Sequence, residues 1–142
     1  MNYNEIKFIL NLDVYDYPIE NVFNRAKRIL NWLFDENFNA TLIDEDINYQ
    51  VKDISSLSNN EIEEITDSFF SFTFDNTVNV PLYKLLVLKN NDKSMILANI
   101  NSLIFDYTSI NNFYGLFEDL NNSPSENDLD SYYKNVKNYL YF

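Results

Sequence analysis

The sequence predicts an α/β fold, a mixed and mostly antiparallel sheet covered by helices, formed as one domain over residues 1–142. The apolar runs 81–88 and 94–100 flank the turn Asn90-Asn91-Asp92, which predicts an antiparallel hairpin. Both runs are almost continuously apolar, so we expect layers over both faces of the sheet. Amphipathic stretches and two capping boxes supply helices for these layers. The chain is long enough to bury roughly two thirds of its unfolded surface.

The first third of the chain predicts a strand and a long helix. Residues 6–12 are mostly apolar and β-prone, which indicates a strand. Pro18 then opens a helix, because a proline in the first turn costs no hydrogen bond. Arg25, Lys27 and Arg28 lie mainly off its apolar stripe, on what we expect to be a solvated face. The stripe consists of Ile19, Val22, Phe23, Ala26, Ile29, Leu30, Leu33 and Phe34.

Residues 41–43 and 49–51 are short β-prone runs, which suggest a hairpin or paired edge strands. Between them, Asp44-Glu45-Asp46 predicts a solvated turn, because a calcium loop would need alternating oxygen ligands and a turn glycine. Ser58 and Glu61 then form a capping box, flanked by Leu57 and Ile62 as a hydrophobic staple. The helix that begins there directs its apolar side inward through Ile62, Ile65 and Phe69, with Phe70 as a further candidate.

The hairpin described above is the predicted centre of the sheet, with Pro81 as the first residue of its first strand. A polar corner follows the second strand, and Thr108 or Ser109 can cap the next helix. Residues 123–126 form a second capping box, so we expect a last helix to dock near the C-terminus. These two helices carry apolar sets at Ile110, Phe113, Leu116, Phe117 and Leu120, and at Leu129, Tyr132, Tyr133, Val136 and Leu140.

The charge of the chain limits its partners. Its 22 acidic and 10 basic residues give a net charge of −12, which repels phosphate backbones and anionic lipid headgroups. We therefore expect no nucleic acid and no membrane partner. The charge indicates either simple solubility or docking onto a basic surface. The N-terminus has the pattern of neither a signal peptide nor a membrane anchor, so the expected location is cytoplasmic.

The chain contains no histidine and no cysteine. Histidine is the usual proton carrier near neutral pH and the commonest metal ligand, and thiolates supply the other usual zinc ligands. Zinc sites, Ser-His-Asp triads, Cys-His dyads and disulfides are therefore excluded for this chain alone. We expect neither a metal nor a cofactor. A carboxylate, lysine or tyrosine with a shifted pKa could still act, but no spacing nominates one.

The corner after the second hairpin strand is the candidate site, because α/β proteins tend to place chemistry where a strand feeds a helix. It reads Asn101-Ser102-Leu103-Ile104-Phe105-Asp106-Tyr107. This heptapeptide resembles the His-His-x-x-x-Asp-Gly motif of nonribosomal peptide synthetase condensation domains and of related acyltransferases, including the chloramphenicol acetyltransferases. Only the Asp is retained.

The resemblance extends over nearly the whole chain, but only to the N-terminal of that family's two lobes. It implies a single chloramphenicol acetyltransferase-like lobe in which strand, helix, hairpin, acidic helix and strand pair follow in the family's order. The Phe74-Asp75 and Pro81-Leu82 pairs match a passage that leads into the family's strand pair. Asp35 and Asn39 stand where the family's early signature has His and Arg.

The resemblance also implies the role of each corner position. The family's second His lies beside the reaction centre between the lobes, and Ser102 in its place cannot act as a base without an activating partner. The Asn101 side chain can form hydrogen bonds, but it cannot gain or lose a proton in the usual pH range. The family's Asp is structural, and Asp106, if buried, would need a partner such as Arg25 or Arg28. In the family, the substrates meet in a tunnel between the two lobes. Tyr107 replaces the glycine of the motif, and its bulky ring should obstruct that tunnel.

Three functions follow from this resemblance. The first is a non-catalytic docking module of nonribosomal peptide or polyketide biosynthesis, which binds a protein partner or itself through the vacant lobe-junction face. The second is one lobe of an acyl or peptidyl transferase that is completed in trans or belongs to a larger synthetase. The third is a pocket for a small apolar or acyl ligand near Ser102. We expect no catalytic residue and favour the first.

Overall fold

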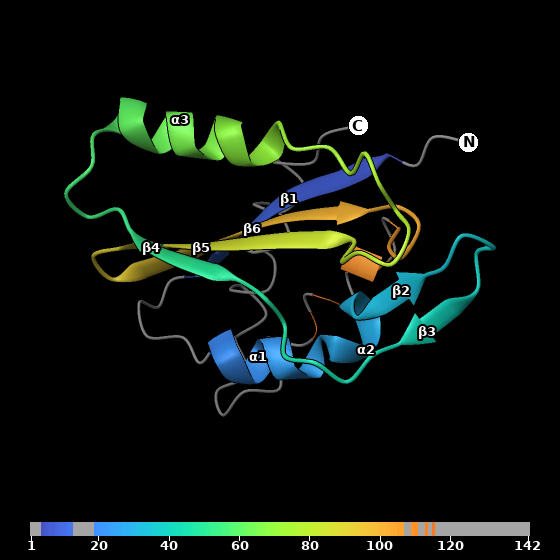
Figure 1. The fold of residues 1–142 in the computed structure, drawn as a ribbon. Helices are drawn as coiled ribbons and strands as arrows, with labels where there is room; N and C mark the ends of the chain where they lie inside the picture. Colours follow the sequence, from blue (N-terminus) through green and yellow to red (C-terminus); the bar gives the residue numbers. More distant parts are fainter. Residues whose placement is uncertain (1–3, 13–18, 107–108, 111–112, 114, 116–142) are drawn as a thin grey trace.

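The computed structural model describes residues 4–12, 19–106, 109–110, 113 and 115. A four-stranded sheet in the order β1-β6-β5-β4 forms its centre, and a separate two-stranded sheet joins β2 and β3 (Figure 1). In chain order the elements are β1 (Glu5–Leu12), α1 (Ile19–Arg25), α2 (Lys27–Leu30), β2 (Trp32–Phe34), β3 (Ala40–Leu42), β4 (Gln50–Asp53), α3 (Asn59–Phe70), β5 (Tyr83–Asn90) and β6 (Lys93–Asn101).

The predicted hairpin is confirmed as the centre of the main sheet. β5 and β6 pair antiparallel from Tyr83 opposite Ile100 to Asn90 opposite Lys93. β1 pairs antiparallel with the other edge of β6, and β4 lies parallel to β5. The sheet is therefore mixed and mostly antiparallel, as the sequence predicts.

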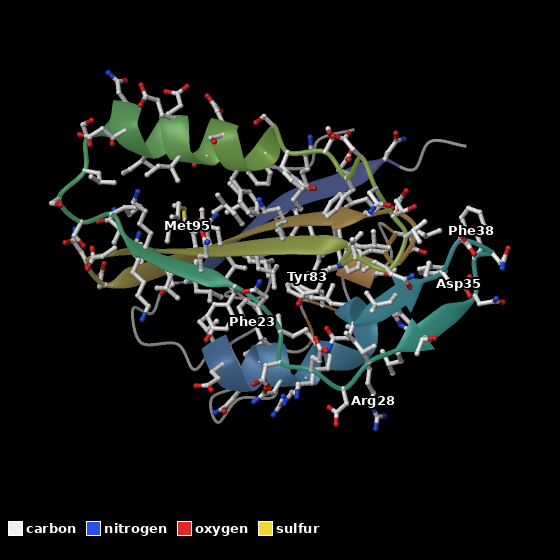
Figure 2. The ribbon with its side chains drawn as sticks, viewed as in Figure 1. Phe23, Arg28, Asp35, Phe38, Tyr83 and Met95 are labelled. Atoms are coloured by element: carbon white, nitrogen blue, oxygen red, sulfur yellow. The ribbon has the colours of Figure 1, made fainter. Side chains whose placement is uncertain are left out.

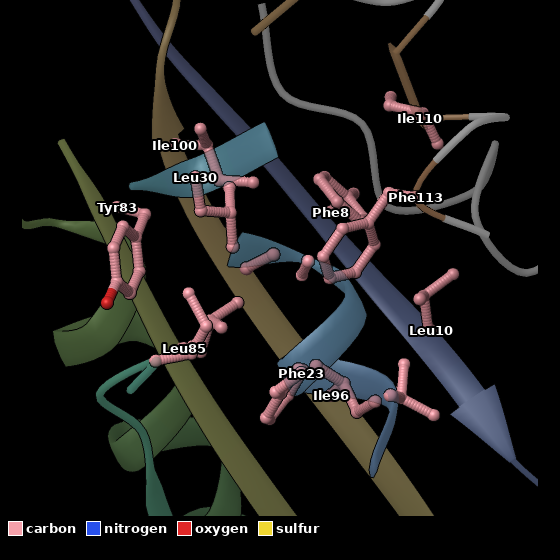
Figure 3. Close-up of a cluster of buried hydrophobic side chains, with 14 of the residues drawn as sticks. Phe8, Leu10, Phe23, Leu30, Tyr83, Leu85, Ile96, Ile100, Ile110 and Phe113 are labelled. Atoms are coloured by element: carbon pink, nitrogen blue, oxygen red, sulfur yellow. The ribbon is translucent and has the colours of Figure 1, made fainter. Parts of the chain in front are cut away.

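Helices cover both faces of this sheet, which confirms the prediction from the apolar strands. Figure 2 shows Met95 on the side of the sheet toward α3, and Phe23 of α1 on the opposite side, between α1 and the sheet. The larger core, on the α1 side, includes the cluster in Figure 3. In this core the ring of Phe8 stacks on that of Phe105, with centroids 5.8 Å apart, and meets the ring of Phe113 edge-on, with centroids 5.7 Å apart. The smaller core lies under α3 and consists of Ile9, Ile54, Phe70, Leu86, Leu88 and Leu97.

Helix α3 begins where its capping box predicts. The Oγ of Ser58 accepts the backbone N–H of Glu61 at 3.2 Å, and the Glu61 carboxylate accepts the backbone N–H of Ser58 at 3.3 Å. Leu57 and Ile62, the predicted staple pair, both pack against the smaller core. The inward positions Ile62, Ile65, Phe69 and Phe70 are confirmed.

The prediction of one long helix that reaches Phe34 is wrong. The chain forms α1 and α2 with a turn at Ala26, and Leu33 and Phe34 lie in β2. Asn31 accounts for the change, because its Nδ2 donates to the Glu45 carbonyl at 2.6 Å and its carbonyl accepts the Ile43 N–H at 3.0 Å. These bonds hold the chain after α2 against residues 43–45. The apolar residues that follow then take cross-strand partners in β3.

The predicted hairpin of residues 41–43 with 49–51 is also wrong. β3 pairs with β2, whereas β4 pairs with β5 in the main sheet. Ile47 is buried in the segment between them, and the backbone N–H of Asn48 donates to the Tyr83 hydroxyl at 3.0 Å. These two contacts direct the chain across the core to the edge of the main sheet instead of back along β3.

Other predicted features differ in smaller ways or lie elsewhere. β5 begins at Tyr83 rather than at Pro81. Pro18, Tyr107, Thr108, the capping box at residues 123–126 and the last helix lie outside the described residues. Among the described helices, none is long and apolar enough to cross a lipid bilayer.

We expect Phe8→Ala to lower the free energy of unfolding by about 3–5 kcal/mol, because it leaves a cavity beside two aromatic rings. Phe8 is 0% exposed, whereas Phe38 is 60% exposed. Phe38→Ala is therefore the matched control and should change stability by less than about 0.5 kcal/mol. Urea denaturation followed by circular dichroism measures both. Similar losses for the two variants would contradict the assignment of the core.

Candidate functional site

The corner after β6 is fixed to the strands on both sides. The backbone N–H of Asn101 donates to the Leu82 carbonyl at 2.8 Å, which joins the end of β6 to the start of β5. The next N–H, that of Ser102, donates to the Asn4 carbonyl at 2.8 Å beside the start of β1. The first two corner positions are therefore held by the sheet itself.

Asn101 uses its side chain to shape the turn. Its Oδ1 accepts the backbone N–H of Leu103 at 2.9 Å, and its carbonyl accepts the N–H of Ile104 at 3.1 Å. The residue is 1% exposed, and its Nδ2 has no hydrogen-bond partner among the described residues. An amide in this position organises the backbone, and it cannot take up a proton near neutral pH.

Ser102, the position that matches the second His, is partly exposed at the corner. A serine hydroxyl attacks an acyl carbon only when a neighbouring base removes its proton. The chain has no imidazole to do this. Buried Tyr83 is no substitute, because burial raises the pKa of its phenol even though the Asn48 N–H bond opposes that rise. The phenol therefore stays protonated at neutral pH.

Asp106 makes capping bonds to Ser109, which is itself already helical, so the prediction of Ser109 as the cap is corrected. The other predicted cap, Thr108, lies outside the described residues. The Asp106 Oδ1 accepts both the backbone N–H and the Oγ–H of Ser109 at 2.8 Å. The backbone N–H of Asp106 in turn donates to the Ser109 Oγ at 3.4 Å. Asp106 is exposed, so burial does not demand an arginine partner for it. Its role in these contacts is to begin a helix.

Asp35 and Asn39, at the positions of the early signature, bond to one another. One Asp35 oxygen accepts the backbone N–H groups of Asn37 and Asn39 at 2.8 and 2.9 Å, and the other accepts the Asn39 Nδ2 at 3.0 Å. The bonds from Asn39 hold the pKa of Asp35 below its usual value. They close the turn between β2 and β3, where Phe38 has a left-handed φ of 61° (Figure 2).

The sequence did not predict that a second amide of β6, that of Asn99, is buried beside Asn101. Asn99 and Asn101 are two residues apart on β6 and therefore point to the same face, the one toward α3. The Asn99 Nδ2 donates to the Phe72 carbonyl at 3.0 Å, while its Oδ1 has no partner among the described residues. Two asparagines at alternate positions in the otherwise apolar run from Met95 to Asn101 were the available signal.

The acidic run before β4 forms ion pairs with α2. The Lys27 Nζ lies 3.3 Å from the Asp46 Oδ1 and 3.7 Å from the Asp44 Oδ1, and both carboxylates are almost fully exposed. This arrangement agrees with the predicted solvated turn. In the part of the chain that the structure describes, no group of three or more His, Cys, Asp or Glu side chains could hold a metal ion.

Comparison with solved structures identifies the fold. The chain is similar to VibH, a condensation enzyme of nonribosomal peptide synthesis, at a TM-score of 0.63 and 11% identity over 83% of this chain and 30% of that one. The starter condensation domain of the rhizomide synthetase RzmA, in a mutant form, is similar at a TM-score of 0.66 and 14% identity, over 92% of this chain and 37% of that one. The cyclization-docking bidomain of EpoB from Sorangium cellulosum is similar at a TM-score of 0.66 and 14% identity, over 87% of this chain and 28% of that one.

These similarities confirm the predicted fold class, since the chain has the architecture of one lobe of a condensation domain. Each similar chain is covered by less than two fifths of its length, so the rest of those proteins has no counterpart here. At 11–14% identity the likeness establishes the fold alone. No model of a known protein family and no curated protein matches the sequence.

We expect Asp106→Ala to lower the free energy of unfolding by about 1 kcal/mol, because the helix loses the acceptor for its Ser109 N–H. Asp106→Ser keeps a capping oxygen and should retain most of that stability. Urea denaturation of both variants at neutral pH measures the difference. Equal losses for alanine and serine would show that Asp106 acts through something other than its capping bond.

Proposed function

We propose that this chain is a non-catalytic condensation-domain-like lobe that serves as a protein interaction or docking module in nonribosomal peptide or polyketide biosynthesis. The observation that carries the proposal is the use of the corner side chains. Asn101 shapes the turn and Asp106 caps the next helix. Both side chains make structural bonds at positions where the resemblance places the family's motif.

The chemistry of acyl transfer supports the proposal. An amine that attacks an acyl thioester must lose a proton, and a positioned base with a pKa near neutrality serves this step best. At the corner, Ser102 has a hydroxyl and Asn101 has an amide, and neither titrates in that range. A base would therefore have to come from outside the chain.

The size of the lobe supports a partner. In the family that the chain resembles, the reaction centre lies between two lobes, and this chain corresponds to one of them. The face that meets the second lobe in that family is the surface that we propose for a partner of this chain. A separate polypeptide, a second copy of the chain or a further part of a larger protein would be that partner.

An alternative is a transferase lobe that is completed in trans. It is favoured by the partial exposure of Ser102, whose hydroxyl is at the position beside the family's reaction centre. In this alternative a second lobe would provide the base. The two functions differ in whether the hydroxyl of Ser102 is needed.

We expect the purified chain to form no amide or ester from carrier-bound aminoacyl and acyl thioesters above the rate in buffer. Ser102→Ala should give the same result, because the chain has no imidazole to activate this hydroxyl. Mass spectrometry of the reaction products measures turnover, and an intact condensation enzyme provides the positive control. Turnover by the wild type that Ser102→Ala abolishes would contradict the proposal and establish the alternative.

The docking half of the proposal predicts a synthetase partner. When the tagged chain is crosslinked in its native cells, we expect subunits of a peptide or polyketide synthetase among the crosslinked proteins. Ser102→Ala should preserve these crosslinks, because the proposed role is binding rather than chemistry. Mass spectrometry identifies the crosslinked residues. Crosslinks confined to proteins outside such assembly lines would refute a role in biosynthesis.

A further inference from the structure

The outer edge of β4 is an open strand edge. β4 is the last strand of the main sheet, and among the described residues no strand pairs with its outer side (Figure 1). The Ile54 N–H donates to the Lys89 carbonyl at 2.8 Å, so Ile54 faces β5. Because strand backbone groups alternate in direction, Lys52 and Gln50 also face β5, and Val51 presents its N–H and C=O outward. The edge therefore offers backbone donors and acceptors to another strand.

A groove lies beside this edge, between α3 and the β4–β5 side of the sheet. Its volume is about 510 Å³, and its apolar lining comes from Leu57, Ile65, Phe69 and Leu86. On the opposite face of β4, Val51 is 53% exposed. Side chains of an added strand alternate between the two faces, so one set would enter the groove and the other would cover Val51.

The helical wall of the groove is acidic. Helix α3 carries four acidic residues and no basic one within Asn59–Phe70, namely Glu61, Glu63, Glu64 and Asp67. Of these, Glu61 and Glu64 line the groove, and Lys52 is the basic residue in its lining. The −12 charge of the whole chain adds to the negative potential there. A basic segment is therefore favoured over a neutral or acidic one.

We propose that this edge and groove bind an extended basic segment of another protein, which adds to β4 as a strand. Its backbone pairs with the outward groups of Val51. Its Lys or Arg side chains enter the groove, where their apolar stems contact the lining and their charged ends meet Glu61 and Glu64. Its apolar side chains, at the alternate positions, cover Val51 on the opposite face. This inference rests on the proposed docking function and deepens it by naming the surface and the chemistry of the partner.

A second copy of the chain fits this surface less well. Two copies would bring together chains that each carry a charge of −12, along an edge strand of only four residues. Repulsion between like charges opposes that pairing, whereas a basic segment gains from the same field. The acids on α3 thus select against self-association at the edge.

The test uses the full ¹⁵N-labelled chain and a short capped peptide of alternating Lys and Val. We expect chemical shift changes at β4 and α3, and no comparable binding of the matched Glu-Val peptide. Val51→Pro removes the outward N–H and should weaken binding at least about tenfold, whereas Val51→Ala keeps that N–H and should stay within about twofold. Amide spectra without peptide show whether each variant is folded.

A pair of charge reversals keeps the test decisive if Val51→Pro does not fold. Glu64→Lys, in the groove lining, should weaken binding about fivefold, and Glu63→Lys, which changes the net charge equally but lies outside that lining, should weaken it less than about twofold. Equal effects of the two reversals, or equal binding of the Lys-Val and Glu-Val peptides, would overturn the proposal. So would a dimer in light scattering that Val51→Pro abolishes.

The outcomes separate this surface from the broader function. If synthetase crosslinks form while the Lys-Val peptide fails to bind, the proposal that the β4 edge is the binding surface is wrong, and the docking function stands. If the peptide binds as expected but the chain turns over thioesters through Ser102, the non-catalytic function is wrong and the surface stands.

Discussion

The burial of β6 on both faces is the constraint on which the rest of the structure depends. All residues from Ile96 to Asn101 are buried, with α3 over one face of the sheet and α1 and α2 over the other. Buried backbone groups must be paired, and β6 pairs with β1 on one edge and β5 on the other along nearly its whole length. A slip of one residue would exchange the side chains of the two faces and place the polar Asn99 and Asn101 on the side of the larger core, so the register of β6 and the position of its end are fixed.

The fixed end of β6 determines how the corner side chains can be used. Asn101 enters the corner still buried, where an unsatisfied polar atom costs free energy, and its Oδ1 is satisfied by the turn that follows. The chain then leaves the core and needs a helix start, which Asp106 provides. The corner conformation is thus maintained by an amide and a carboxylate, without an imidazole.

The features predicted correctly from the sequence are those with local causes. The β5–β6 hairpin follows from two apolar runs around an asparagine-rich turn, and α3 follows from the capping box at Ser58. The wrong predictions involve partners distant in sequence. The stripe that includes Leu33 fits a helical period, but the bonds from Asn31 to Glu45 and Ile43 outweigh it. The parallel pairing of β4 with β5 has no local signature, because it depends on where Ile47 is buried. At the candidate site the sequence located the corner, while the capping role of Asp106 depended on a bond that only the structure shows.

Charge resolves the difficulty that an open sheet edge creates. Exposed strand edges invite pairing with other chains, and proteins commonly oppose this with short edge strands and charged side chains. β4 has four exposed residues, among them Lys52 and Asp53, and the acidic helix α3 borders the groove beside it. The same negative potential opposes the pairing of identical chains and, in our proposal, favours a strand of opposite charge. A chain of this charge can therefore keep a strand edge that is open among the described residues without aggregation, provided that the proposed partner is basic there.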